Sequence, residues 1–183
     1  MLVETCPKID SITGEIKEFV RNHEAGFLTA LQDYGDQIGR GREKCGTHKG
    51  WSTGLNQCDI GTEIYGLALK QRFPMTQALL SVSLVVIIND FDYYQDEDNL
   101  PTKLHGRLNL STPSGINLFL DPTYGQVNRR LNRVVLDHTS RESIYYGRIS
   151  RTPHLFLIEP SQNLEEAEYY HPNEIAAIKE SLK

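Results

Sequence analysis

Three residues of different chemical types, Cys58, His105 and Asp121, follow one another in an order that can support nucleophilic catalysis. A cysteine thiolate is a strong nucleophile, and an imidazole beside it can take up and return its proton. A carboxylate can orient that imidazole and stabilise its charged form. Two predicted elements must bring the three together: a hairpin that carries the histidine and the aspartate, and a helix that carries the cysteine.

The hairpin is predicted over residues 104–121, where two aliphatic strands flank a turn that contains proline and glycine. A slip of one residue would move every side chain to the other face, so the hydrophobic pattern restricts the register. A register in which Leu108 faces Leu118 and Leu110 faces Ile116 gathers the aliphatic side chains on one face.

The same register places two polar residues on the other face of the hairpin. Arg107 lies opposite Phe119, and His105 lies directly opposite Asp121. Directly opposed residues have Cβ atoms about 5 Å apart, so the carboxylate is expected to accept a hydrogen bond from the imidazole.

A helix is predicted to begin at Cys58, because Ile60, Ile64 and Leu67 recur on one face and Pro74 closes the segment. The first turn of a helix has unpaired N–H groups and the positive end of the helix dipole. Both favour a thiolate over a thiol, so Cys58 is the expected nucleophile.

A thiolate that attacks a carbonyl carbon produces an oxyanion, which needs hydrogen-bond donors. The backbone N–H of Cys58 is the first predicted donor. The second is expected from Gln57, Asn56 or Trp51, which precede the nucleophile and are predicted to bind the substrate.

Before this helix, the period of apolar residues predicts a longer amphipathic helix over residues 9–38. Gly39 and Gly41 are expected to end it and to open a loop that runs to about Gln57. A loop of this length in a compact domain is typical of functional segments.

The rest of the chain is predicted to be mostly strands, at residues 79–88, 134–136, 144–149 and 155–158, with a short helix from Pro172. Helices followed by a mainly antiparallel sheet define an α+β fold. A length of 183 residues and the absence of repeats favour a single domain that covers the whole chain, residues 1–183.

The string Asp121-Pro122-Thr123-Tyr124-Gly125 after a strand, preceded by a strand histidine and a cysteine that opens a helix, resembles the transglutaminase-like branch of papain-like cysteine enzymes. The resemblance covers about residues 51–126. It implies the core fold of that family, with the nucleophile at a helix N-terminus. It also implies Cys58 as nucleophile, His105 as base and Asp121 as orienting residue.

The expected function is that of a cysteine enzyme that acts on an amide or a thioester through a thioester acyl-enzyme. Peptidase, deamidase, transglutaminase and acyltransferase activities share this intermediate, so the substrate is a protein, a peptide or a small acyl compound, and no cofactor is expected. The alternative is a binding or interaction module on the same fold that has no turnover. In that case Cys58 is a buried structural residue.

Two other constellations use nearby residues. Cys45 and His48, with Cys58 and a further histidine, form a possible zinc site, but one such pair without a second is a poor zinc signature, and no metal is expected. Asp137-His138 is an alternative source of the base, although no orienting partner for it is visible.

Composition narrows the class of partner and the compartment. Nineteen basic and 24 acidic residues give a net charge of −5, which disfavours nucleic acid or an anionic membrane as a partner. The three cysteines are too few for a disulfide framework, so a reducing compartment is expected. Without a recognisable signal peptide or membrane segment, the chain is expected to be cytoplasmic where it is made, and later export without a cleaved signal is compatible with the sequence.

Overall fold

The structure is a computed structural model. It describes residues 7–45, 55–73, 81–89, 104–111, 115–126, 133–146, 149–157 and 160–183. Within these ranges the chain forms a mixed α+β fold whose sheet is antiparallel, in agreement with the predicted class.

Two helices precede the sheet, one lies between its last strands and two follow it. The helices are α1 (Pro7–Cys45), α2 (Leu55–Arg72), α3 (Glu142–Tyr146), α4 (Gln162–Tyr170) and α5 (Pro172–Glu180). The strands are β1 (Ser81–Asn89), β2 (Leu104–Ser111), β3 (Asn117–Asp121), β4 (Val135–His138) and β5 (Ile149–Leu157). Their order in the sheet is β4-β3-β2-β1-β5, and each neighbouring pair is antiparallel.

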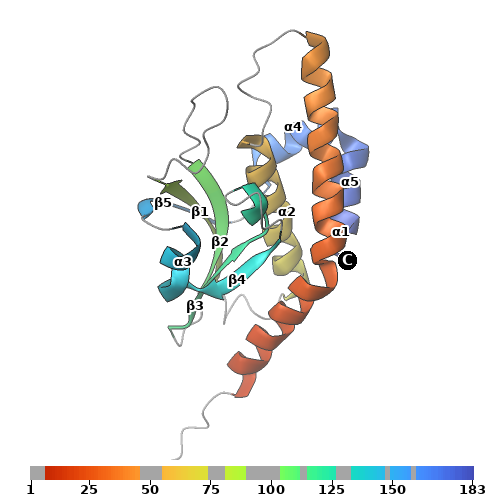
Figure 1. Cartoon of the computed structure of the whole chain (residues 1–183). Coiled ribbons are helices and arrows are strands. Elements are labelled where there is room, and N and C mark those ends of the chain that lie inside the picture. The colour runs from red at the N-terminus through yellow and green to blue at the C-terminus, as the bar shows by residue number, and fades with distance from the viewer. Residues whose placement is uncertain are drawn as a thin grey trace, which may run out of the picture.

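The helices form a layer on one face of the sheet, and α3 covers part of the other face (Figure 1). Helix α2 is the inner helix of the layer, because it contacts β1 and β2 on one side and α1, α4 and α5 on the other. The sheet face toward α2 is apolar, since Leu108 and Leu110 of β2 and Leu118 and Leu120 of β3 all point into the same core. This packing fixes the position of α2 on β2.

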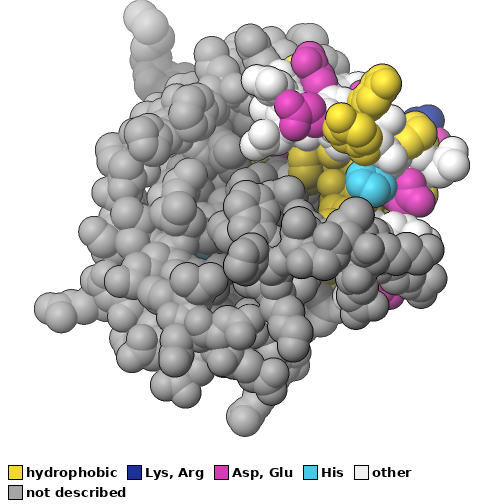
Figure 2. Space-filling view, turned by 90° about the horizontal axis from the view of Figure 1, so that it is seen from above, with side chains coloured by type: hydrophobic (Ala, Val, Ile, Leu, Met, Phe, Trp, Pro, Cys, Tyr) yellow, Lys and Arg dark blue, Asp and Glu magenta, His cyan; other side chains and the backbone are white. Residues whose placement is uncertain are grey.

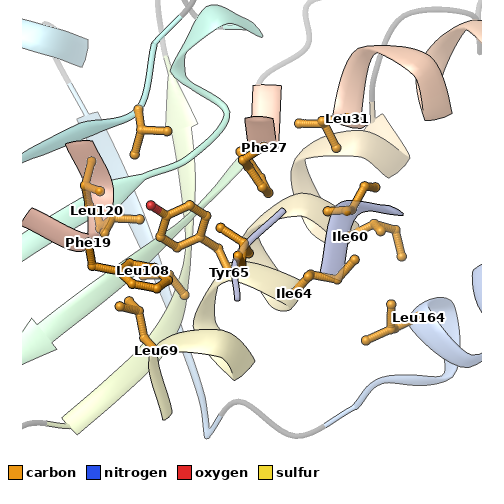
Figure 3. Packing of buried hydrophobic residues seen from close by; sticks show 14 of the residues in the cluster. Phe19, Phe27, Leu31, Ile60, Ile64, Tyr65, Leu69, Leu108, Leu120 and Leu164 are labelled. Atoms are coloured by element: carbon orange, nitrogen blue, oxygen red, sulfur yellow. The ribbon is translucent and has the colours of Figure 1, made fainter. Parts of the chain in front are cut away.

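Tyr65 of α2 lies at the centre of this core (Figure 3). Its ring meets Phe19 and Phe27 of α1 edge to face, with ring centroids 5.8 and 5.0 Å apart. Leu31, Ile60 and other aliphatic side chains complete the cluster. The period of apolar residues along α1 and α2 therefore encodes the contact between these two helices.

The outer surface of the helical layer is mixed in character. Tyr169 and Tyr170, at the end of α4, are exposed, and their rings contact each other edge to face. Figure 2, which views the molecule from above, shows hydrophobic and acidic side chains together on the helical side. This end of the layer thus presents apolar and charged groups to solvent.

The hairpin register differs from the prediction by two residues. Leu108 pairs with Leu120 and Leu110 with Leu118, whereas the predicted partners were Leu118 and Ile116. A shift of two leaves every side chain on its predicted face, so the hydrophobic pattern could not distinguish the two registers. The turn decides the register, because Gly115 has a positive φ of 84° and Ile116 stays outside the ladder.

Three predicted boundaries were also wrong. Helix α1 does not end at Gly39 or Gly41 but continues to Cys45, since a glycine weakens a helix by only about 1 kcal/mol and its neighbours here are good helix formers. Residues 144–146 are not a strand as predicted, because they belong to α3, and β5 begins at Ile149. Helix α2 begins at Leu55, three residues before Cys58, and α4 was not predicted.

Candidate active site

His105 and Asp121 form a buried hydrogen-bonded pair on the face of the sheet that α3 covers. The His105 Nε2 atom lies 2.7 Å from Asp121 Oδ2. The two residues are 8% and 0% exposed, so water competes little for this contact. An ionised carboxylate can only accept, so Nε2 carries the proton and Nδ1 is the nitrogen that a thiol or a substrate would meet.

The pair forms across a diagonal of the hairpin, and not between directly opposed residues as predicted. Continuing the observed register places Asp121 opposite Arg107 and His105 opposite Thr123. Diagonal neighbours on one face lie about 7 Å apart, which is within reach of an imidazole and a carboxylate. The hydrogen bond predicted from the sequence is therefore present, although the geometry that produces it differs.

The Asp121 carboxylate has a donor for each oxygen. Its Oδ1 atom accepts from the backbone N–H of Thr123 at 3.0 Å and from the Thr123 hydroxyl at 3.3 Å. Its Oδ2 atom accepts from His105 and also from the Tyr146 hydroxyl, at 2.6 Å. These contacts fix the orientation of the carboxylate, and through it the ring of His105.

A buried ion pair lies beside this network. Arg107 Nη2 is 2.5 Å from Glu142 Oε1, and Arg107 is 0% exposed. Its guanidinium carbon lies 4.7 Å from the ring centre of Phe119 and 5.6 Å from that of Tyr146. The charge of Arg107 is thus balanced by one carboxylate and two aromatic faces.

Helix α3 owes its position to these contacts. Glu142 and Tyr146 are four residues apart, so both lie on the same face of the helix, and both are buried. Burial raises the pKa of Tyr146 well above the ordinary value for tyrosine, and the charge and hydrogen bond of Asp121 raise it further. Tyr146 therefore remains a neutral O–H donor to the carboxylate.

The N-terminal part of α2 reaches the hairpin next to this pair. The Thr62 hydroxyl donates to the carbonyl oxygen of Gly106, at 3.2 Å. A Cβ on residue 61 would lie 3.1 Å from Cγ2 of Thr123 and from Cδ1 of Leu31, which is tighter than most such contacts, so glycine at this position favours the close approach of the helix. Cys58 precedes Gly61 and Thr62 by three and four residues, which places it one turn earlier on the same helix face.

Helix α2 and strand β2 run side by side in the same direction (Figure 1). Thr62 of α2 lies beside Gly106 of β2. The helix turn that precedes Thr62 therefore lies beside the beginning of β2, which contains His105. The backbone thus brings the position of Cys58 toward His105. The N–H groups of the cap residue and of the first three residues of a helix have no intrahelical partners, and Cys58, the fourth residue of α2, directly follows them.

The remaining predicted site residues lie near the same helix start. Asn56 and Gln57 are in the first turn of α2, and not in the preceding loop. Their side chains, like that of Cys58, lie outside the described residues, and so does the whole of Trp51. Their predicted roles as oxyanion donors and substrate contacts stay predictions.

The alternative constellations are placed differently. Cys45 is the last residue of α1, with its side chain outside the described residues, and His48 lies wholly outside them. Among the residues that the structure describes, no group of three or more His, Cys, Asp or Glu could hold a metal ion. Asp137 and His138 lie toward the other end of β3 from Asp121, because His138 pairs with Leu118.

Asp137 also has partners of its own. Its carboxylate accepts from the Tyr145 hydroxyl at 2.7 Å and pairs with Arg141 at 3.1 Å. Desolvation opposes its ionisation, but the hydrogen bonds of Tyr145 and of the His138 N–H, with the charge of Arg141, outweigh that effect and lower the pKa of Asp137. Asp137 is therefore ionised and bonded to Tyr145 and Arg141.

Sequence reasoning missed the contribution of α3 to the site. Neither Tyr146 nor Glu142 was predicted as a residue of the site. The spacing of Glu142 and Tyr146 by four residues was the available signal, because it is a helical spacing that extends into residues 144–149, which were predicted as a strand.

Comparisons with known proteins leave the site to be interpreted from its own geometry. No family model, no curated protein and no solved structure matches this chain. Across the described part of the chain, the helices are all too short or too polar to cross a membrane.

Proposed function

We propose that this chain is a cysteine-nucleophile enzyme in which Cys58, His105 and Asp121 form a catalytic triad. The observation that carries the proposal is the buried 2.7 Å contact between His105 Nε2 and Asp121 Oδ2, at the point where the helix bearing Cys58 contacts β2. A carboxylate that holds the far nitrogen of an imidazole prepares the near nitrogen to act as a base. The proposed core is transglutaminase-like and covers about residues 51–126.

The first half of the reaction forms an acyl-enzyme. His105 takes the proton of the Cys58 thiol, and the sulfur attacks the carbonyl carbon of an amide or a thioester. A C–S bond forms and the carbonyl oxygen becomes an oxyanion. As the C–N or C–S bond to the leaving group breaks, His105 returns the proton to the departing amine or thiol.

The second half releases the acyl group. Water or an amine attacks the thioester carbon while His105 accepts its proton, and the bond between the carbon and the Cys58 sulfur breaks. The proton then passes to the sulfur or stays on the imidazole as an ion pair. Hydrolysis, deamidation, transamidation and acyl transfer differ only in the leaving group and the acceptor, so all four belong to this proposal.

The helix start supplies the oxyanion site in this mechanism. The backbone N–H of Cys58, the fourth residue of α2, is one proposed donor. Gln57, Asn56 or Trp51 supplies the second. The substrate is a protein, a peptide or a small acyl compound, and this chemistry needs no metal or cofactor.

Alkylation by iodoacetamide at about pH 5.5 tests the proposal, because an activated thiolate reacts there and an ordinary cysteine, with a pKa of about 8.5, scarcely does. We expect peptide mapping to find label on Cys58 before Cys6 and Cys45, and His105→Ala to slow that labelling. Equal labelling of the three cysteines, or unchanged labelling in His105→Ala, would favour a binding module in which Cys58 is structural.

A further inference from the structure

We propose that Tyr146 is a positioning residue that lowers the proton affinity of His105 by sharing the carboxylate oxygen to which His105 is bonded. The inference rests on the proposed function, because it concerns the base of that triad. It adds a residue from α3, an element outside the hairpin and the nucleophile helix.

Two donors meet on one oxygen atom of Asp121. His105 Nε2 lies 2.7 Å and the Tyr146 hydroxyl 2.6 Å from Oδ2, while Oδ1 receives both contacts from Thr123. Tyr146 is 2% exposed, so water does not replace its hydroxyl readily. The short O–H···O⁻ contact is of the strong, charge-assisted kind.

The direction of the change in the proton affinity of His105 follows because His105 and Tyr146 share the negative charge of one carboxylate. Each donor on Oδ2 stabilises part of the carboxylate charge, and less of that charge then acts on the imidazole. With the Tyr146 hydroxyl removed, Asp121 interacts more strongly with His105, and the charged imidazolium gains more than the neutral ring. Protonated His105 is therefore favoured when Tyr146 cannot donate.

Among the described residues, the ionisable groups around this pair are Arg107, Glu142 and Tyr124. Arg107 shares the strand and face of His105, and its charge is paired with Glu142 of α3. Tyr124, after β3, lies 5.9 Å from Tyr146 between ring centres, and its hydroxyl donates to the carbonyl of Tyr145. Cys58 stands on α2. None of these groups changes in a Tyr146→Phe variant.

Neighbouring Tyr145 provides a matched control. It lies on the same short helix and packs on the same ring of Phe119, but its hydroxyl donates to Asp137, 2.7 Å away, and not to Asp121. Tyr145→Phe removes the same atom from the same helix. It differs from Tyr146→Phe in the carboxylate that loses a donor.

The experiment is an NMR titration of the imidazole signals in the full chain, with the His105 signal assigned by its loss in His105→Ala. In Tyr146→Phe we expect the titration midpoint of His105 to rise by about 0.5 to 1 pH unit. This is the size expected if part of the free energy of the hydrogen bond from Tyr146 to Asp121 acts on the protonation of His105. In Tyr145→Phe it should stay within about 0.2 of the wild type, given the separate carboxylate. An unchanged midpoint in Tyr146→Phe, or equal shifts in both variants, would overturn the inference.

This readout is independent of catalysis. If Cys58 proves unreactive while the His105 midpoint moves as expected, the proposed function fails and the coupling of Tyr146 to His105 stands. Should Tyr146→Phe not fold, the wild-type spectrum decides the inference. A slowly exchanging Tyr146 hydroxyl proton with a nuclear Overhauser contact to the Nε2 proton of His105 is expected, and its absence would contradict the shared oxygen.

Discussion

The two faces of the β2–β3 hairpin are both buried, yet they are built in opposite ways. The face toward α2 consists of leucines that pack against helices, and none of their side chains needs a specific partner. The face toward α3 contains His105, Arg107 and Asp121. Tyr146 donates to Asp121 and Glu142 pairs with Nη2 of Arg107, while Nε and Nη1 of Arg107 have no hydrogen-bond partner among the described residues.

The difference shows how one alternating sequence serves two purposes. Apolar contacts are not directional, so the leucine face contributes stability in proportion to the area that it buries. Buried polar groups are costly without partners, so the contacts of the polar face are directional and join particular atoms. This requirement fixes the geometry of His105, which is the property that a catalytic base needs.

The largest expected effect is on catalysis, in variants that lose a catalytic side chain while both faces of the hairpin stay folded. Cys58→Ala should abolish formation of the acyl-enzyme, and His105→Ala should slow it by on the order of a thousandfold or more. Cys58→Ala should cost less than about 1 kcal/mol in the free energy of unfolding, because one atom is removed. Single-turnover acylation and urea unfolding of each variant measure the two effects.

Asp121→Asn should be milder than His105→Ala in the same acylation assay, since the amide keeps an acceptor but loses the charge that stabilises the imidazolium. A loss of activity in Asp121→Asn greater than that in His105→Ala would show that the carboxylate has a role beyond orienting the histidine.

The next effect is on stability and belongs to the polar face. Glu142→Gln removes the negative partner of a fully buried guanidinium and should lower the free energy of unfolding by about 3–5 kcal/mol. Urea denaturation measures it. The double variant Glu142→Gln with Arg107→Met should recover most of the loss, because no unpaired charge is left; a double variant as unstable as the single one would contradict this account.

A substitution on the apolar face should lower the free energy of unfolding without changing the reactivity of Cys58. Leu110→Ala leaves a cavity in the main core and should cost about 2–5 kcal/mol. Below the unfolding transition, the rate of Cys58 alkylation should match that of the wild type, since Leu110 lies on the opposite face from His105. A strong fall in that rate would mean that the two faces are not separable.

The smallest expected effect is pH-dependent and concerns Asp137. The pKa of Asp137 is lower in the folded chain than in the unfolded chain, so ionised Asp137 stabilises the fold. This contribution to the free energy of unfolding is complete above the ordinary aspartate pKa of about 3.9, and it is lost as the pH falls through the lowered pKa of the folded chain. Tyr145→Phe should therefore cost less than about 1 kcal/mol near pH 7. Urea unfolding in a pH series should show that difference shrinking below about pH 4.

The face of each hairpin residue could be predicted from the sequence, because side chains alternate and a register error of two does not change the face. For the same reason the contact of His105 with Asp121 was predictable, although its diagonal geometry was not. The pairing depends on the turn, where the Asn117 side chain donates to the Gly115 carbonyl at 3.2 Å and the ladder starts one residue later than expected.

The α3 contribution could not be obtained in this way. Ile144, Tyr145 and Tyr146 favour a strand by local propensity, whereas in the structure they belong to a helix whose Glu142 and Tyr146 contact the hairpin. The extent of α1 was hidden for a related reason. Glycines mark a plausible helix end, but local propensity is a weak signal compared with the helix formers around them.

The most direct test of the triad is the mass of the intact protein after incubation with a short peptide thioester. The proposal predicts a mass increase equal to the acyl group in the wild type, mapped to Cys58, at an unchanged rate in Tyr145→Phe. It predicts a much slower increase in His105→Ala and none in Cys58→Ala. An adduct that forms equally fast in Cys58→Ala, or a wild type that stays unmodified by thioesters, esters and peptide amides alike, would contradict it.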